Sequence, residues 1–171
     1  MQKARRDMLT AHTFPRNFAL KRFSDISMDH LQQLSDDIKH SMSRQNFVAV
    51  KPMVTETVAN IFMEYLATRA FEKSDAHFQK MIANFDKVFW EVNQGYASDF
   101  LPFLQPFQRN HMKTIKQWSN EIRAFILENV VGDRYESWNV GSEPNDYIES
   151  LIDYVKQEIE PRMEWEMVNR E

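Results

Sequence analysis

The sequence predicts an all-α fold of six or so helices, with no strand stronger than the short run Phe47–Val50. Glycine (3 residues) and proline (6 residues) are scarce in 171 residues, which argues against a β fold with many turns. Apolar residues recur at the i, i+3, i+4 spacing of amphipathic helices through most of the chain. The length suits one domain or one lobe of a larger domain, because a chain of ~150 residues buries roughly 70% of its unfolded surface.

The composition excludes several classes of function. The net charge is −4 and the isoelectric point is about 5.8, which argues against a nucleic-acid-binding surface. No apolar run approaches the ~20 residues of a membrane span, and no secretory signal opens the chain. The absence of cysteine excludes a disulfide framework, a thiolate zinc site, an iron–sulfur cluster and a cysteine nucleophile.

The N-terminal part of the sequence predicts two helices joined by a connector. Lys3–Thr13 is expected to form a short basic helix, which Phe14-Pro15 ends, and Arg16–Phe23 is expected to be a connector. Ser27 is a plausible N-cap for the next helix. That helix carries one apolar stripe, formed by Leu31, Leu34, Ile38 and Met42.

Two strong helices follow. Val54–Phe71 carries apolar residues at helical spacing, and Ser74 is expected to start the next helix, which has a wide apolar face running from Phe78 to Val92. The most aromatic stretch of the chain, Phe85–Phe107, begins inside this helix and contains Gly95, Pro102 and Pro106, so one helix cannot run through it. Its segment Ser98–Phe107 is expected to pack on a core, cover a pocket or touch a membrane or a partner.

The C-terminal third predicts two more helices. Arg109–Val131 is expected to be helical, with Gly132 as its stop, and Asp133–Asn145 is expected to be a surface loop. Asp146–Glu160 is expected to form the last full helix, which Pro161 breaks. Met163–Glu171 resembles the opening turn of a further helix.

Candidate chemical groups are few. The histidines are scattered, and Asp37 with His40 at i, i+3 spacing supplies too few ligands for a metal. The acidic residues of the last helix, which are Asp146, Glu149 and Asp153, are expected to form a solvated face. Arg5 and Arg6 can hold carboxylates or phosphates bidentately, although spacing alone favours a solvated basic face. Trp90, Trp118 and the phenylalanine stripes are more often core than pocket.

Several motifs occur in a characteristic order. Lys3-Ala-Arg-Arg-Asp-Met-Leu comes first, Ala59-Asn60 and Arg69-Ala-Phe71 follow, and Asp99-Phe-Leu-Pro102 lies in the aromatic stretch. Asn145–Ile152 and Met163–Met167 complete the series. Read together, they resemble helix C, helix E, the F–G region, helix H and the first turn of helix I of the cytochrome P-450 family of haem-thiolate monooxygenases. The stretch Phe89–Pro102, with His12-Thr-Phe-Pro-Arg16, is similar to the insect Spook group, the Halloween cytochromes P-450 of ecdysteroid synthesis.

Two positions depart from the family pattern. The Trp-x-x-x-Arg of helix C lacks its tryptophan, since Met1 or Gln2 would occupy that place. The usual Phe-Gly before the exit of helix E is replaced by Ala67-Thr68.

The resemblance implies a partial P-450 domain over residues 1–171, from helix C to the start of helix I. The membrane anchor, the body of helix I, the Glu-x-x-Arg of helix K and the cysteine loop lie outside it, so no axial metal ligand is expected and the chain alone is expected to be inactive. Arg6, or alternatively Arg5, is expected to contact a haem propionate. The substrate pocket or its access region is expected to include Phe85, Phe89, Trp90, Phe100, Leu101 and Phe103.

The resemblance also implies partners and a location. The full-length enzyme is expected to oxidise a sterol-like molecule, to receive electrons from NADPH-cytochrome reductase and to lie at the endoplasmic-reticulum membrane. The alternative is a stand-alone all-helical interaction module that binds a partner through Ser98–Phe107. A third interpretation is a regulator that competes for the reductase through a basic patch formed by Lys3, Arg5, Arg6, Lys21 and Arg22. A loosely packed, aggregation-prone product is expected if the apolar helix faces lack their cover.

Overall fold

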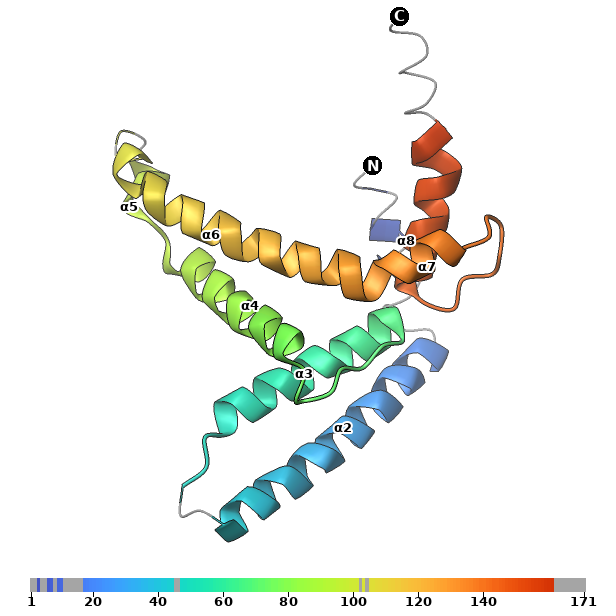
Figure 1. Cartoon of the computed structure of the whole chain (residues 1–171), viewed down its shortest axis with the longest axis horizontal. Helices are drawn as coiled ribbons and strands as arrows, with labels where there is room; N and C mark the ends of the chain where they lie inside the picture. Colours follow the sequence, from blue (N-terminus) through green and yellow to red (C-terminus); the bar gives the residue numbers. More distant parts are fainter. Residues whose placement is uncertain are drawn as a thin grey trace, which may run out of the picture. The chain divides into compact units, whose positions relative to one another are not determined.

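The computed structural model describes residues 3, 6–7, 9–10, 17–44, 47–101, 103 and 105–161. They form helices α2 (Asn17–Arg44), α3 (Val50–Ala67), α4 (Ala76–Gln94), α5 (Ala97–Phe100), α6 (Gln105–Ile126), α7 (Gly132–Ser137) and α8 (Tyr147–Tyr154), with π-helical turns η2 (Leu127–Val131) and η3 (Val155–Ile159) (Figure 1). No strand occurs among these residues, which confirms the predicted all-α class. Within the described part of the chain, no helix combines the length and apolarity needed to cross a membrane.

The chain divides into two compact units, one formed by residues 1–70 and 131–171 and the other by residues 71–130. In the first unit, α2 packs along α3, and α8 packs against α3 (Figure 1). Phe23 of α2 meets Tyr65 of α3 edge-on, with ring centroids 5.1 Å apart. Leu34, Ile61 and Ile152 are buried beside this contact layer, so the unit has a small apolar core of its own.

The first helix of this unit is longer than the sequence predicts. Its first residue is Asn17, so the expected connector Arg16–Phe23 is wrong from Asn17 onward, and Ser27 lies inside α2 instead of capping it. The stretch Phe18–Arg22 contains good helix formers and no glycine or proline, so nothing in it stops a helix. The contact between Phe23 and Tyr65 stabilises the longer helix, because it buries aromatic surface.

Both ends of α3 also differ from the prediction. The helix begins at Val50, and Pro52 lies in its first turn, where the missing N–H has no helical partner to lose. It ends at Ala67, before the expected Phe71, because Thr68 adopts the left-handed conformation with φ 51°. The Thr68 N–H donates to the Glu64 carbonyl oxygen at 2.9 Å, which closes the helix end.

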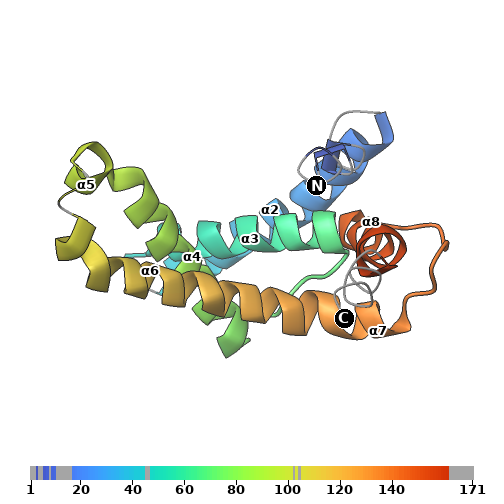
Figure 2. The same ribbon diagram turned by 90° about the horizontal axis from the view of Figure 1, so that it is seen from above.

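The second unit is a pair of packed helices, α4 and α6 (Figure 2). Its core is aromatic: Phe78 is fully buried, stacks on Phe71 with centroids 4.9 Å apart, and lies 6.2 Å from Phe125. Asp75, and not Ser74, caps α4, because its carboxylate accepts from the N–H groups of His77 and Phe78 at 2.8 and 3.1 Å. α6 begins at Gln105 and not at Arg109, since Pro106 fits the first helical turn.

The helical run does not end at Gly132 as predicted, because the π-helical turn η2 leads directly into α7. The expected loop Asp133–Asn145 is therefore partly helical, and its remainder is held by Asp153, whose carboxylate accepts from Trp138 Nε1 and Gly141 N at 3.0 Å each. The predicted last helix follows as α8 and η3, and Asp146 is the N-cap of α8. Met163–Glu171 lies outside the described residues, and the described members of Lys3–Thr13 are helical.

The prediction of a solvated acidic face on the last helix is wrong for Asp146. This residue is buried, accepts from the Glu149 N–H at 2.9 Å and binds Arg134 Nη2 at 2.7 Å. Glu149 Oε1 binds the same guanidinium at 2.7 Å, and Arg134 Nη1 donates to the Ala67 carbonyl oxygen at 2.8 Å. Asp146 and Glu149, which the sequence predicts to face solvent, thus bind the guanidinium of Arg134 in a largely buried ion cluster.

Some apolar faces are partly covered. Ile115, Ile122 and Ile126 of α6 are half-buried, as are Ile148 and Leu151 of α8, whereas Ile152 is buried. The loosely packed product expected from the sequence stays a prediction.

Candidate functional site

The candidate site lies in the second unit, along the C-terminal half of α4 and the connection to α6. One apolar stripe of α4 contains Phe78, Ile82, Phe85 and Phe89 at i, i+3, i+4 spacing. Phe78 and Ile82 are buried, but Phe85 and Phe89 are exposed. The stripe therefore extends beyond the part that Phe71 and Phe125 cover.

The exposed half of the stripe contains two neighbouring rings. The rings of Phe85 and Phe89 stack nearly parallel, at 14° and a centroid separation of 6.4 Å. Trp90 is also exposed but lies about 100° further round the helix. The predicted pocket residues of α4 thus present two different faces, and only Phe85 and Phe89 share one.

The connection between α4 and α6 adds more apolar surface. Phe100, Leu101, Phe103 and Phe107 are all exposed, and the two most exposed are Phe100 at 82% and Phe107 at 85%. Monomeric proteins rarely leave several neighbouring phenylalanines in water, so such a surface marks a contact with a ligand, a membrane or another part of a protein. Of the three outcomes expected for Ser98–Phe107, packing of these rings on the core of the second unit does not occur.

Polar contacts hold the base of this connection. The Tyr96 hydroxyl donates to Glu91 Oε2 through a short hydrogen bond and lies 2.8 Å from His111 Nε2. His111 Nε2 also lies 3.0 Å from Glu91 Oε2. Nearby in sequence, the buried Ser98 donates to Gln108 Oε1 at 2.5 Å. The sequence did not predict this cluster, because its members come from three segments that the turn at Gly95 and the packing of α4 on α6 bring together.

The electrostatics of this cluster favour an ionised carboxylate. The hydrogen bond from Tyr96 is the largest effect and lowers the pKa of Glu91 from its usual value; burial opposes it, and weaker contributions from His111 lower the pKa further. A charged acceptor strengthens both hydrogen bonds that it receives.

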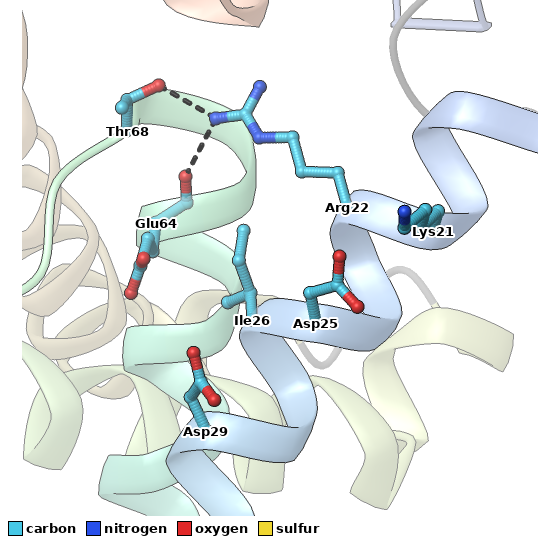
Figure 3. Close-up of a pocket in the computed structure, with 7 residues that line it drawn as sticks. All are labelled: Lys21, Arg22, Asp25, Ile26, Asp29, Glu64 and Thr68. Carbon is cyan, nitrogen blue, oxygen red and sulfur yellow. Dashed lines mark hydrogen bonds between the residues drawn. The ribbon is translucent and has the colours of Figure 1, made fainter.

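The predicted arginines belong to the other unit. Arg6 is exposed, as is Lys3, and Arg5 lies outside the described residues. Lys21 is exposed as well, whereas Arg22 is half-buried and engaged (Figure 3). Its guanidinium donates to Thr68 Oγ1 at 2.9 Å and to the Glu64 carbonyl oxygen at 3.5 Å, so it supports the end of α3.

Figure 3 shows the cleft of about 480 Å³ that surrounds Arg22, between α2 and α3. Asp25 and Asp29 line its α2 side, and Glu64 lies on α3, where its carboxylate meets His30 Nε2 at 2.7 Å. Acidic and basic groups nearly balance, and Arg22 and Glu64 are occupied by contacts within the unit. We therefore interpret the cleft as part of the packing between α2 and α3.

No metal site is formed by the described residues, since no three acidic, histidine or cysteine side chains converge among them. His40 is exposed on α2, and Asp37 is half-buried with a contact of its own, so this pair does not gather further ligands.

The sequence itself decides the family. The family model for cytochrome P450 matches residues 1–169. The chain belongs to the cytochrome P450 family. Cytochrome P450 307a1 of Drosophila melanogaster is 30% identical over 154 residues, which is 89% of this chain and 28% of that protein. The probable cytochrome P450 520A1 of Dictyostelium discoideum is 26% identical over 78 residues, which is 46% of this chain and 14% of that protein. No solved structure matches the chain significantly.

Cytochromes P450 use haem as cofactor. An exposed guanidinium such as Arg6 can pair with a haem propionate. The side chains of this chain therefore fit only the propionate edge of the haem. The 171 residues contain no cysteine and hence no axial thiolate, so they do not fit the iron, and no chemical step at iron follows from them. The chain spans little more than a quarter of the Drosophila relative, at 28%.

Proposed function

We propose that this chain is the substrate-side helical part of a haem-dependent monooxygenase that oxidises a sterol precursor in ecdysteroid synthesis. By the resemblance of its motifs, it runs from helix C to the start of helix I. Membership of the cytochrome P450 family and the identity with the Drosophila relative support the reaction class. The motifs shared with the Spook group support the substrate class.

One observation carries the proposal: the apolar stripe of α4 continues as exposed, stacked phenylalanines beyond its aromatic core. A sterol is a rigid apolar molecule, and buried area with few polar contacts holds such a ligand. Phe85 and Phe89 offer exposed, stacked rings, and the exposed Trp90, Phe100, Leu101 and Phe103 are assigned to the access region.

The test uses the complete enzyme that carries this sequence. Phe89→Ala removes a ring that a bound sterol would cover, and burial of a phenylalanine contributes about 1.5–3 kcal/mol, so sterol affinity should fall at least tenfold. Affinity is measured by titration of the sterol against the haem absorption spectrum. Phe47→Ala is the control, because Phe47 is also exposed, at 82% against 62% for Phe89, but belongs to the first unit. Equal affinities for the wild type and Phe89→Ala would contradict the proposal.

The same proposal places the connection of α4 and α6 at the surface of the endoplasmic-reticulum membrane, where an apolar substrate enters. Phe100 and Phe107 project into solvent and can enter the interfacial layer of a bilayer. Phe107→Ser should weaken binding of the 171-residue chain to phosphatidylcholine vesicles, and Phe47→Ser should not. Equal binding by both variants would remove the membrane contact from the proposal.

The electron donor proposed for the full-length enzyme is NADPH-cytochrome reductase, which the exposed Lys3, Arg6 and Lys21 could approach by charge. The haem propionate contact is proposed for Arg6, with Arg5 as the alternative. The chain alone, supplied with haem and reductase, should release no oxidised sterol, because no thiolate is present. Turnover by the purified chain would refute this.

The stand-alone interaction module remains the second candidate, because the same exposed phenylalanines suit a protein partner. It predicts that Phe89→Ala leaves sterol affinity unchanged while weakening binding of a protein partner.

A further inference from the structure

The base of the connection between α4 and α6 is closed by three polar side chains from three segments. Glu91 lies in the last turns of α4, Tyr96 follows the helix end, and His111 lies in the second turn of α6. Gly95, with φ +68°, turns the chain between the first two. These three side chains are called the Tyr96 cluster below.

The hydrogen-bond pattern of the Tyr96 cluster has one consistent arrangement. A phenol has a single proton, and Tyr96 donates it to Glu91 Oε2. His111 Nε2 must then carry a proton, because it faces the Tyr96 oxygen at 2.8 Å and the Glu91 oxygen at 3.0 Å, which are both acceptors. Each member therefore contacts the other two. Loss of any one member removes two of the three contacts of the cluster.

The aromatic rings reinforce this arrangement. Tyr96 and His111 meet edge-on, with centroids 5.4 Å apart and planes inclined by 64°. The hydrogen bond of Ser98 to Gln108 adds a second link between the segment after α4 and the start of α6. Both links lie just before and just after the exposed phenylalanines.

The position of the cluster separates it from the core of the second unit. Glu91 lies thirteen residues after the buried Phe78 in the same helix, which corresponds to about 20 Å along the axis. The aromatic contacts among Phe71, Phe78 and Phe125 therefore hold the pair of helices together at a distance from the connection. A contact that far from the core fixes local geometry and contributes little to whether the helices pair.

We infer that Tyr96, Glu91 and His111 are positioning residues that hold the α4–α6 connection in the conformation that presents its exposed phenylalanines. The connection has few buried apolar contacts of its own, so the cluster is what limits its conformations. The inference rests on the proposed function in one respect: the phenylalanines so presented are those proposed to meet the sterol and the membrane.

The first test needs no substrate. Tyr96→Phe in the 171-residue chain removes only the hydroxyl and leaves the ring. Hydrogen exchange of peptides covering α5 and Leu101 should become at least fivefold faster, while the urea midpoint of the whole chain stays unchanged. Tyr154→Phe in α8 is the matched control and should change neither. Unchanged exchange in Tyr96→Phe, or acceleration spread evenly over the chain, would overturn the inference.

His111→Ala provides a second variant with a separate prediction. It should accelerate exchange of the same peptides, and the double variant with Tyr96→Phe should be no faster than the faster single one, because both break one cluster. Additive acceleration would show that the two side chains act independently and would overturn the inference.

The second test separates the inference from the proposed function. In the complete enzyme, Tyr96→Phe should raise the KM for sterol about threefold with kcat unchanged, because it disturbs presentation and no reacting group. If Phe89→Ala weakens sterol binding and Tyr96→Phe leaves KM unchanged, the proposed function stands and the role of the cluster at the substrate is overturned. If Phe89→Ala has no effect while exchange is accelerated by Tyr96→Phe, the proposed function fails and the positioning role within the chain is supported.

Discussion

Arg134→Ala is the perturbation whose effect follows most directly from the structure. The arginine binds Asp146 and Glu149 at 2.7 Å each and donates to the Ala67 carbonyl oxygen at 2.8 Å. The side chain of Asp146 has no exposed surface, whereas those of Arg134 and Glu149 are 20% and 17% exposed. Burial is the largest single effect and acts to lower the pKa of Arg134, but the hydrogen bonds and charges of Glu149 and Asp146 together outweigh it and raise that pKa, so the pair stays charged.

The magnitude comes from the carboxylate left behind. Removing one partner of a buried ion pair costs about 3–5 kcal/mol, and the partial exposure of Arg134 and Glu149 points to the lower end. About 3 kcal/mol should lower the melting temperature by roughly 6–12 °C for a chain of this length. Since domains are stable by about 5–15 kcal/mol, this one change removes a large share of the stability.

The assay is urea unfolding of the 171-residue chain, followed by circular dichroism. Lys39→Ala is the control, because Lys39 pairs with Asp36 at 3.2 Å on the surface, with both side chains more than half exposed at 70% and 61%, and its loss should not be resolved. Arg134→Met combined with Asp146→Asn should be less destabilised than Arg134→Ala, since no buried charge remains unpaired. If Arg134→Ala unfolds at the same urea concentration as the wild type, the argument from the buried carboxylate is refuted.

Further predictions concern the aromatic core, the end of α3 and pH. Phe78→Ala should destabilise the chain by about 3–5 kcal/mol in urea unfolding, because it empties a fully buried site, and a cost below 1 kcal/mol would contradict this. Thr68→Ala should cost about 1–2 kcal/mol, because the bond from Arg22 is lost while the left-handed backbone remains; Thr68→Gly should cost less, and the reverse order would refute the account. Hydrogen bonds from Trp138 and from the Gly141 N–H lower the pKa of Asp153. Their stabilising effect is complete above the usual carboxyl range and is lost as pH falls through the lowered pKa, so the urea midpoint should drop as pH falls below about 4; a rise would contradict this sign.

The sequence was sufficient for the helical class and for the helix interiors, because hydrophobic periodicity reports on the faces that become buried. It was less reliable at helix ends. The sequence predicts a break at Pro106 and a start at Val54 for the helix that begins at Val50, although a proline such as Pro52 or Pro106 is tolerated in a first turn, where no helical hydrogen bond is lost. Ser27 was read as a cap, although its neighbours continue the helix without interruption.

Hydrophobic periodicity does not predict which distant segments come into contact. Asp146 was correctly placed at a helix start, but its burial depends on Arg134, which belongs to a stretch read as a surface loop. The Tyr96 cluster joins residues separated by 5 and by 15 positions, a pattern that no single helix produces. The exposure of Phe85 and Phe89 could not be predicted either, since their spacing is the same as that of the buried Phe78 and Ile82.

The left-handed Thr68 has a consequence for how this sequence could have arisen. In the family pattern that the motif around Ala67-Thr68 resembles, glycine stands in the place of Thr68, and glycine adopts a positive φ without steric cost, whereas a β-branched residue rarely does. Here the hydroxyl that threonine adds is the group that Arg22 binds. We therefore expect positions 22 and 68 to vary together among relatives, with threonine at 68 found where arginine stands at 22. A lineage that replaced the glycine first would have carried an unsupported strained residue, so the arginine is expected to be the older of the two.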